Sequence, residues 1–369
     1  MNQTAPPSLA HAVSPRRATR RVAFACAAVL GLFALPVLVN KPYVLHMGVM
    51  LFLAVLQGQA WNVIGGFTGQ HSLGHAAYFG LGAYTTMMLL ERGGVPPWYG
   101  VWAGVACALF LGAAIGSITF RLRGPYFVLA SISVAEIIRL AALYFKDITR
   151  GAEGFLLSEM PSLELGNWRL EFIGKRPFYY VALCAALASI AANWWVLRSK
   201  LGYYFQAIRE DQDAARSLGI ATPLYKNLAL AISVAFTAWA GGFYAMFVKF
   251  IEPNSVFGID VSVEFVLICI IGGIGRLFGP VLGACLLVPL SEVLRNPKGL
   301  VQIGLLSDQS AFVEFIERHH LANAHLLIYG VLVVVVVLFA PEGVLGAIEQ
   351  ALSRRRARAS GQLAPPTAA

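Results

Sequence analysis

Charged residues are scarce in this chain of 369 residues. Asp, Glu, Lys and Arg together make up 13% of it, whereas an average soluble domain carries about 25%. Between Tyr43 and Leu90 there is none of them. Several apolar runs reach the roughly 18 to 20 residues that a helix needs to cross a bilayer, and strand-like alternation between turn signals is missing. The composition therefore predicts an all-α polytopic membrane protein.

Several motifs that carry chemistry are also missing. The five cysteines lie in apolar runs without a C-x-x-C pair, which predicts neither disulfides nor a metal site. His71 and His75 are four residues apart, but "HSLGH" lacks the Glu of a zinc-binding H-E-x-x-H motif. No G-K-[ST] loop for ATP occurs. The basic residues are scattered, so nucleic acid is not an expected partner. We predict no catalytic residue, no metal and no cofactor.

The apolar runs predict about ten transmembrane helices. We place them near residues 22–39, 43–64, 72–90, 98–119, 125–144, 178–197, 228–249, 262–274, 277–294 and 325–340. The tails are poor in residues that could pack. We therefore divide the chain into a disordered N-terminal tail (1–15), one transmembrane domain (16–346) with a polar loop (198–227), and a basic C-terminal tail (347–369); residues 359–369 are expected to be disordered.

The basic residues predict the orientation of the chain. With the N-terminus inside the cell, more than half of the 28 Lys and Arg residues lie on the cytoplasmic side. They include the arginines before the first span and the "RRRAR" run at 354–358. An excess of basic residues marks cytoplasmic loops. Both termini are therefore predicted to be cytoplasmic, and the net charge of +9 also favours contact with anionic lipid of the bilayer.

The stretch "GGFTGQHSLGH", Gly65–His75, interrupts the uncharged segment. As one helix this segment would run about 72 Å, more than twice the thickness of the hydrocarbon core. It must turn back, and non-helical backbone at membrane depth is tolerated only inside protein or beside a wet cavity. One interpretation is a short cytoplasmic turn with glycines for tight helix packing. The other is a discontinuous helix pair beside a translocation path.

A second glycine-rich interruption favours the interpretation as a translocation path. "IIGGIGRLFGPVLGA", Ile270–Ala284, repeats the pattern late in the chain with imperfect spacing. Paired interruptions in two halves of a transporter point to the substrate path, so the sequence predicts two glycine-broken helix pairs. We expect Gly273 to tolerate a side chain less well than Gly100 at a span entrance.

Charges inside spans are further candidates. Glu136 and Arg139 lie three residues apart on one helical face, which is typical of a neutralising pair, with gating as the alternative. Glu264 lies near a span end, where it can reach water.

The loop Arg198–Asn227 contains an amphipathic pattern. Phe205, Ile208, Ala215 and Leu218 recur at near-helical spacing before Gly219. We expect one short helix over about 206–219 beneath the membrane; a solvated loop with an incidental helix is the alternative. Asp213-Ala214-Ala215 followed by Gly219 resembles the E-A-A-x-x-x-G loop of ABC importer permeases, with Asp in place of Glu.

From about Tyr43 to Gly346 the chain resembles the LivM-type permease subunits of branched-chain amino acid ABC importers. The resemblance rests on five ordered blocks: "GQHSLGHAAYFGLGAYT" (69–85), "LRGPYFVLASISVAEIIRL" (122–140), "TRGAEGF" (149–155), "AIREDQDAARSLGI" (207–220) and "IGGIGRLFGPVLGA" (271–284). Two positions depart from the pattern: His71 replaces an aliphatic residue, and Arg150 replaces the first glycine of a T-G-G turn.

The resemblance implies a permease of the bacterial inner membrane that is not itself an enzyme. Its partners would be a second permease, two cytoplasmic ATPase subunits and a periplasmic binding protein that delivers a small-molecule solute. The expected translocation path comprises Gly65, Gly66, Gly69, Gln70, Ser72, His75, Glu136, Gly272, Gly273 and Gly275. The expected ATPase-coupling residues are Glu210, Asp211, Asp213, Ala214, Ala215 and Gly219, with the Ala214–Ala215 face docking into an ATPase groove.

Other functions remain open at this stage. Related permeases carry urea, short amides and other small solutes. A self-sufficient channel or secondary carrier, and a membrane enzyme using His71, His75 and Glu136, are rivals from other classes. Neither rival needs the D-A-A-x-x-x-G segment, which favours the importer.

Overall fold

A computed structural model of the chain shows an almost entirely helical protein. It describes residues 15–39, 41–122, 124–157, 163–165, 168–170, 174–295 and 342–359, with a few positions between 327 and 340. The longer helices are α1 (Pro15–Leu38), α2 (Pro42–Trp61), α3 (His75–Gly93), α4 (Pro97–Thr119), α5 (Pro125–Tyr144), α7 (Arg176–Arg198), α8 (Lys200–Glu210), α10 (Thr222–Val248), α12 (Ile259–Gly272), α13 (Gly279–Arg295) and α17 (Gly343–Ala359).

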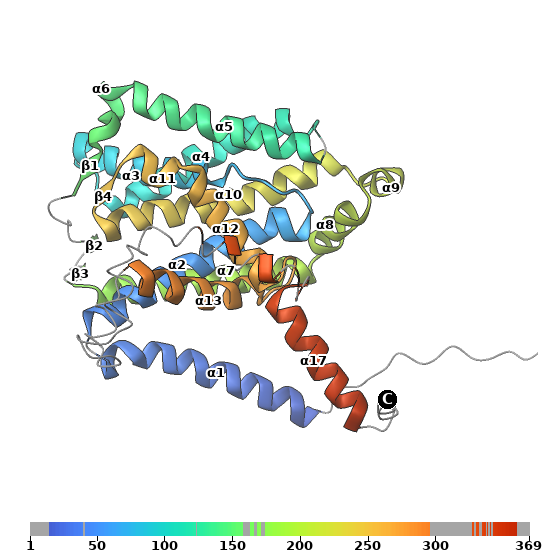
Figure 1. Cartoon of the computed structure of the whole chain (residues 1–369). Helices are drawn as coiled ribbons and strands as arrows, with labels where there is room; N and C mark the ends of the chain where they lie inside the picture. Colours follow the sequence, from blue (N-terminus) through green and yellow to red (C-terminus); the bar gives the residue numbers. More distant parts are fainter. Residues whose placement is uncertain are drawn as a thin grey trace, which may run out of the picture.

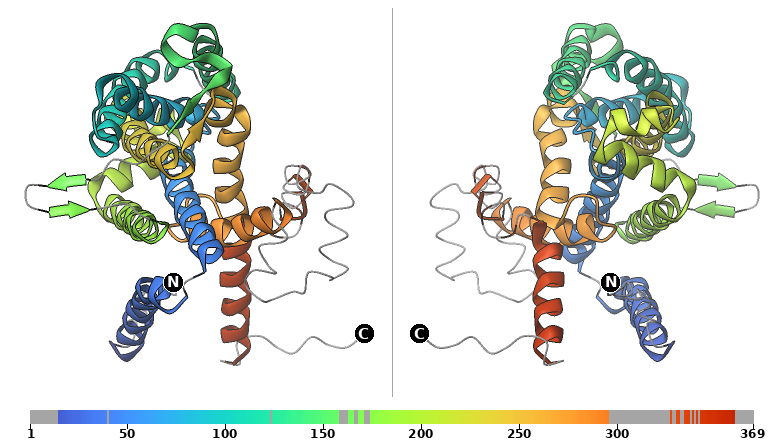
Figure 2. Two further views of the ribbon diagram at one scale, coloured as in Figure 1. Left: turned by 90° about the vertical axis from the view of Figure 1, so that its left-hand side faces the viewer. Right: turned by 90° about the vertical axis from the view of Figure 1, so that its right-hand side faces the viewer.

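Shorter elements connect these helices. They are the π-helix η1 (Asn62–Phe67), α6 (Lys146–Thr149), η2 (Gly151–Glu153), α9 (Gln212–Ser217), α11 (Pro253–Phe257), and the strands β1 (Phe155–Leu156), β2 (Leu163–Leu165), β3 (Trp168–Leu170) and β4 (Phe250–Ile251). Strand β1 pairs antiparallel with β4, and β2 with β3. The β2–β3 hairpin extends away from the helices (Figure 2).

The helices confirm a multi-pass, all-helical membrane protein. Every predicted span up to residue 294 coincides with a helix. Six segments are long and apolar enough to cross a membrane: Pro42–Phe67, Pro97–Thr119, Pro125–Tyr144, Arg176–Arg198, Thr222–Val248 and Pro253–Gly272. Most of the predicted span at 325–340, nearly all of the predicted N-terminal tail and residues 360–369 lie outside the described residues, whereas residues 347–359 of the predicted C-terminal tail are helical. The total number of spans therefore stays a prediction.

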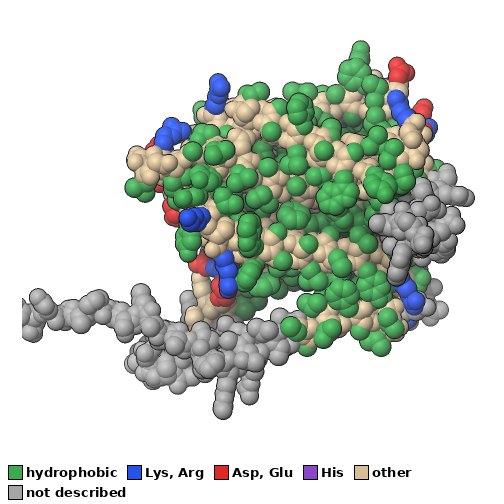
Figure 3. Space-filling view, turned by 180° about the vertical axis from the view of Figure 1, so that it is seen from behind, with side chains coloured by type: hydrophobic (Ala, Val, Ile, Leu, Met, Phe, Trp, Pro, Cys, Tyr) green, Lys and Arg blue, Asp and Glu red, His purple; other side chains and the backbone are tan. Residues whose placement is uncertain are grey.

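The surface supports a position in a bilayer. On the face drawn in Figure 3, hydrophobic side chains cover the middle, and most Lys, Arg, Asp and Glu side chains gather toward the two ends of the helices. Exposed large side chains such as Phe110, Ile118 and Ile137 belong to α4 and α5. An apolar surface of this extent is stable in lipid, whereas soluble proteins expose far smaller patches.

Small residues allow the central helices to approach closely. A Cβ atom added to Gly104 of α4 would lie 3.0 Å from the Cα of Gly82 in α3, and Gly82 itself faces the backbone of Ala238 in α10. Without a hydrophobic driving force between helices in lipid, close backbone packing of this kind supplies association energy. Helices α3, α4 and α10 thus pack closely on one another, while the outer side of α4 stays exposed (Figure 1).

The bundle has two distinct ends, which we name by their elements. Figure 1 shows β1, β4 and α6 at one end, the β1–β4 end, and α8 with α9 at the other, the α8–α9 end. Helix α17 extends from the α8–α9 end and begins at Gly343, so the predicted boundary between residues 346 and 347 falls within a helix. In the views of Figure 2, α12 stands upright between the upper helices and α13.

Candidate functional site at the glycine breaks

The first glycine break is a structured turn inside the protein. Helix α2 widens into η1, and residues 68–74 have no helical structure. The Thr68 hydroxyl and the Gln70 backbone N–H both donate to the Ile64 carbonyl, at 2.6 and 3.0 Å. The Trp61 indole N–H donates to the Ser72 carbonyl at 2.7 Å. The backbone groups released from the helix thus find partners within the chain, as membrane depth requires.

The second break follows the end of α12. Gly273 has a φ of 120° and Gly275 a φ of 74°, a region that residues with a side chain rarely adopt. Helix α13 then begins at Gly279, whose backbone lies directly against Gly272 and Gly273. The chain therefore reverses here between two closely packed helix ends.

The two breaks meet, and Asn62 joins them. The Asn62 side-chain oxygen accepts a hydrogen bond from the Gly275 N–H at 2.9 Å, and its amide nitrogen donates to the Arg276 carbonyl at 3.0 Å. One turn earlier on α2, the Gln59 amide donates to the Leu277 carbonyl at 2.7 Å. Asn62 and Gln59 are fully buried. The predicted path glycines of the two breaks are thus brought together, in a tightly packed junction.

Sequence reasoning missed the residues that form this junction. Gln59 and Asn62 are amides in a segment without charges, and that polarity was the available signal. Asn193 of α7 extends the network, because its amide donates to the Gln59 side-chain oxygen at 2.6 Å. Both ends of the Gln59 and Asn62 amides are thereby satisfied, which favours a unique packing, whereas the Asn193 side-chain oxygen is buried without a hydrogen-bond partner among the described residues.

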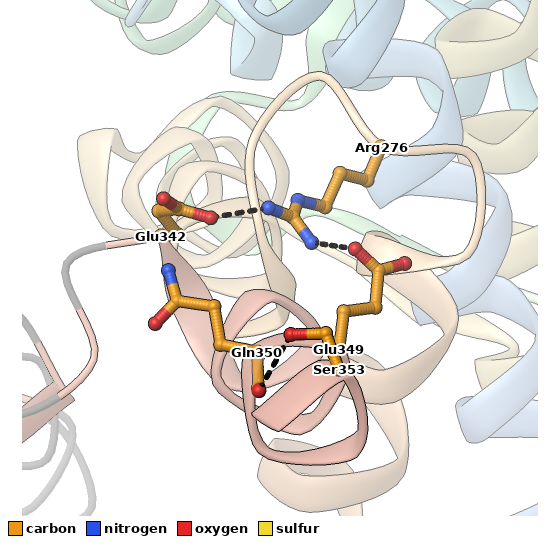
Figure 4. Close-up of polar contacts among 5 residues, drawn as sticks. All are labelled: Arg276, Glu342, Glu349, Gln350 and Ser353. Carbon is orange, nitrogen blue, oxygen red and sulfur yellow. Dashed lines mark hydrogen bonds and ion pairs between the residues drawn. The ribbon is translucent and has the colours of Figure 1, made fainter. Parts of the chain in front are cut away.

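Arg276 links the second break to α17. Its guanidinium forms an ion pair with Glu342 at 2.6 Å and another with Glu349 (Figure 4). Gly343, at the start of α17, packs against the backbone of Gly273. Helix α17 is therefore held directly on the break, although both acids are more than half exposed and such pairs contribute little free energy singly.

The predicted coupling helix is in fact two helices, so a continuous helix over 206–219 is wrong. Helix α8 ends at Glu210, and Asp211 adopts an extended backbone at the start of α9. Its carboxylate accepts hydrogen bonds from the N–H groups of Asp213 and Ala214 at 2.8 and 3.0 Å. Asp is a strong N-cap residue that competes with helix continuation. Gly219, at a φ of 85°, follows the end of α9.

The α9 segment has one buried and one exposed side. Ala215 is only 2% exposed, whereas Ala214 is exposed and Leu218 is 82% exposed. The Lys226 ammonium donates to the Gln212 side-chain oxygen at 2.7 Å and ties α9 to α10. Ala215 therefore packs within this chain, and the expected Ala214–Ala215 docking face is wrong for Ala215. The exposed side carries Asp213, Ala214 and Leu218.

Arg209 connects α8 to the junction of the breaks. Its guanidinium donates to the Gly66 carbonyl at 2.9 Å. A Cβ atom at Gly275 would collide with the same guanidinium. Sequence reasoning did not single out Arg209. Arg209 thus links α8 directly to the backbone of the first break.

The polar residues predicted for the path make contacts inside the chain. His75 is fully buried, and its Nε2 lies 2.8 Å from the Ser233 hydroxyl. The Ser72 hydroxyl accepts from the Gly74 N–H, and the Gln70 amide donates to the Thr68 carbonyl. His71 is partly exposed, and its ring stacks on Trp61; partial desolvation of the ring, and secondarily the Arg209 charge, lowers the pKa of His71.

Glu136 lies apart from the breaks. Its carboxylate accepts from the Arg139 Nε at 2.9 Å, and Arg139 reaches the Asn254 side chain at 2.6 Å. The geometry is that of a neutralising pair. No hydrogen bond or ion pair joins Glu136 to either break within the described part of the chain.

Arg150, which departs from the expected glycine pattern, has an unusual backbone conformation. Arg150 adopts a left-handed conformation with φ 61°, followed by Gly151 and Gly154, also at positive φ. A left-handed conformation favours glycine, so Arg150 holds a backbone geometry that a glycine would adopt without strain. Arg150 forms an ion pair with Glu91 and lies over the Phe155 ring.

These features define a class of protein. The chain is a multi-pass helical membrane protein in which two broken helices meet and a projecting pair of helices reaches their junction. It belongs to the family described as "Branched-chain amino acid transport system / permease component", which matches residues 43–337. The resemblance to LivM-type permeases is thereby confirmed.

Individual relatives agree with this assignment. The chain is 28% identical to the "High-affinity branched-chain amino acid transport system permease protein LivM" of Salmonella typhimurium and to that of Escherichia coli, over 90% of this chain and 76% of each relative. It is 30% identical to the "Autoinducer 2 import system permease protein LsrC" of Klebsiella pneumoniae, over 41% of this chain and 47% of that protein. No solved structure matches the chain.

Proposed function

We propose that this chain is one of two transmembrane subunits of an ABC importer for branched-chain amino acids. Its partners are a second permease, two cytoplasmic ATPase subunits and a periplasmic binding protein. The complex resides in the bacterial inner membrane, with both termini of this chain in the cytoplasm. The family match and the names of the two LivM relatives support this assignment.

The contact between Arg209 and Gly66 carries the mechanism. ATP binding in the partner ATPases moves the exposed side of α9, and α8 moves with it. Arg209 passes this displacement to the Gly66 carbonyl. Because Asn62 ties Gly275 and Arg276 to the same turn, both breaks shift together. Helices α3 and α13, which begin after the breaks, then exchange an outward-open for an inward-open arrangement.

Reconstitution tests the importer. This chain in liposomes with its companion permease, both ATPases and the binding protein is expected to take up labelled leucine only when ATP is present. The chain alone should neither hydrolyse ATP nor transport leucine. ATP-independent leucine flux through the isolated chain would contradict the proposal and favour a secondary carrier.

A substitution tests the coupling step in the same system. Arg209→Gln removes the donor to the Gly66 carbonyl and is expected to leave ATP hydrolysis measurable while leucine uptake falls. Lys200→Gln, on an exposed position of the same helix, is the matched control and should transport normally. Equal uptake by both variants would show that Arg209 transmits nothing.

A further inference from the structure

A polar cavity lies away from the glycine breaks, between α2, α12 and α13. Its volume is about 190 Å³, which suits a small solute. Helices α3, α10 and α11 complete its walls. The described residues that line it are Met50, Leu53, Ala54, Gln57, Phe79, Tyr244, Ser255, Asp260, Val261, Glu264, Phe265, Val288, Ser291, Glu292 and Arg295. We call it the α2–α13 cavity.

The cavity holds charges of both signs. Asp260 and Glu264 are four residues apart on α12, and Glu292 and Arg295 are three apart on α13. These spacings place each pair on one helix face, and both faces line the cavity. Within the described residues, Arg295 has no ion pair. Charged side chains that face one another across a cavity in a membrane protein are candidates for a solute site.

Gln57 gives an independent indication of a ligand. It is 8% exposed and lines the cavity from α2. Its amide makes no hydrogen bond to any residue that the structure describes, unlike Gln59 half a turn later. A buried amide normally has a partner, because leaving it without one costs about 1–3 kcal/mol. The Gln57 amide lines the cavity and is therefore available to a ligand bound there.

The rest of the wall is apolar. Leu53 and Ala54 of α2, Phe79 of α3, Phe265 of α12 and Val288 of α13 surround the polar groups. A few placed polar groups within apolar walls are typical of small-molecule sites. The exposed rim residues Ser255, Asp260 and Arg295 flank α11 and the end of α13, so the cavity opens there, while Gln57 lies deeper along α2.

We propose that the α2–α13 cavity binds the transported solute as a zwitterionic amino acid with an apolar side chain; this rests on the importer function proposed above. Arg295 of α13 takes the carboxylate, and the acids of the facing helix α12, Asp260 and Glu264, take the ammonium group. The apolar side chain packs between Leu53 and Phe265. Three acids repel a dicarboxylate, and a neutral solute such as urea gains nothing from either charge.

Protection of a thiol in the cavity tests this assignment. Ser291→Cys is introduced into this chain after Cys26, Cys107, Cys184 and Cys285, which are exposed, are replaced by serine. The chain is assembled with its companion permease and ATPases, without the binding protein, and its modification by a thiosulfonate reagent is timed. Saturating leucine is expected to slow modification severalfold. Isocaproate and isoamylamine, which keep only one charge each, should need a roughly tenfold higher concentration for the same protection.

Variants separate binding from folding. Arg295→Gln should abolish protection by leucine, and Arg295→Lys should retain part of it, because the charge remains without the planar fork of the guanidinium. Arg176→Gln, an exposed arginine at the start of α7, is the control and should be protected like the parent.

The outcomes distinguish the two proposals. Absence of ATP-driven leucine uptake by the full importer would overturn the importer function. Normal uptake without any protection by leucine would overturn the cavity assignment alone. Equal protection by isoamylamine and leucine would overturn the role of Arg295 in holding a carboxylate.

Discussion

Asn62 is the residue that joins the two halves of the site. Its side chain satisfies one donor and one acceptor of the second break, and neither of these backbone groups can regain a helical partner where the chain turns. The same amide also explains why residue 66 is a glycine. An added Cβ there would collide with the Asn62 side-chain oxygen and lie 2.7 Å from the Gly275 nitrogen. Residues of both breaks thus pack against, or form hydrogen bonds with, the Asn62 side chain.

Asn62→Ala is expected to destabilise the protein. The substitution leaves the part-buried Gly275 N–H and Arg276 carbonyl without their partner, which costs about 1–3 kcal/mol of unfolding free energy. The melting temperature in detergent and the leucine uptake should both fall. Asn227→Ala is the matched control, because Asn227 donates only to Pro223 within its own helix. Similar melting temperatures for the two variants would refute a special role for Asn62.

Gly273 is expected to be intolerant of any side chain. At a φ of 120° another residue is strained, and its Cβ would lie 3.1 Å from the Glu342 carbonyl oxygen. Gly273→Leu should therefore reduce uptake strongly and loosen α17. Gly100 is no neutral comparison, because its Cβ would lie 3.1 Å from the Thr86 Cα. Gly31 of α1 has open space around it, so Gly31→Leu should transport normally; equal losses would show that the break is an ordinary turn.

Among the elements, α9 shows what the sequence could and could not predict. The near-helical spacing correctly located helical structure after Arg198, because amphipathic periodicity reflects burial of one face. It did not reveal the interruption at Asp211, since an Asp fits both an exposed helical position and an N-cap. Nor did it reveal that Ala215 faces its own chain, because Ala is compatible with a buried or an exposed position.

Two alanine substitutions on α9 are expected to differ in kind. Ala214→Trp adds bulk to the exposed side and should block uptake while the chain inserts, assembles and melts normally. Ala215→Trp overfills a position that is 2% exposed. It should reduce the unfolding free energy of the chain by roughly 1–3 kcal/mol, which is measured as a lower melting temperature. Normal uptake by the Ala214 variant would show that this side of α9 contacts no ATPase.

For the whole molecule, the sequence predicted the helices far better than their contacts. The positions of the spans follow from the apolar runs, because the backbone of a membrane-spanning segment must form its hydrogen bonds within its own helix. The contact between Asn62 and Gly275 joins residues more than 200 positions apart, and nothing local encodes it. The same holds for the α2–α13 cavity: Glu264, Glu292 and Arg295 are visible as charges near span ends, but their common face depends on how α12 packs against α13.

The orientation of the bundle in the membrane is the broadest prediction. The excess of basic residues places the α8–α9 end in the cytoplasm and the β1–β4 end outside, which the coupling mechanism requires. Leu218 and Leu156 are 82% and 69% exposed and lie at these opposite ends. In a chain whose exposed native cysteines are replaced, an impermeant maleimide added to intact spheroplasts should label Leu156→Cys but not Leu218→Cys. Inverted membrane vesicles should show the opposite pattern, and permeabilised membranes should label both. Labelling of Leu218→Cys from outside the cell would place α9 on the side that has no ATP, and coupling through its exposed side would then be impossible.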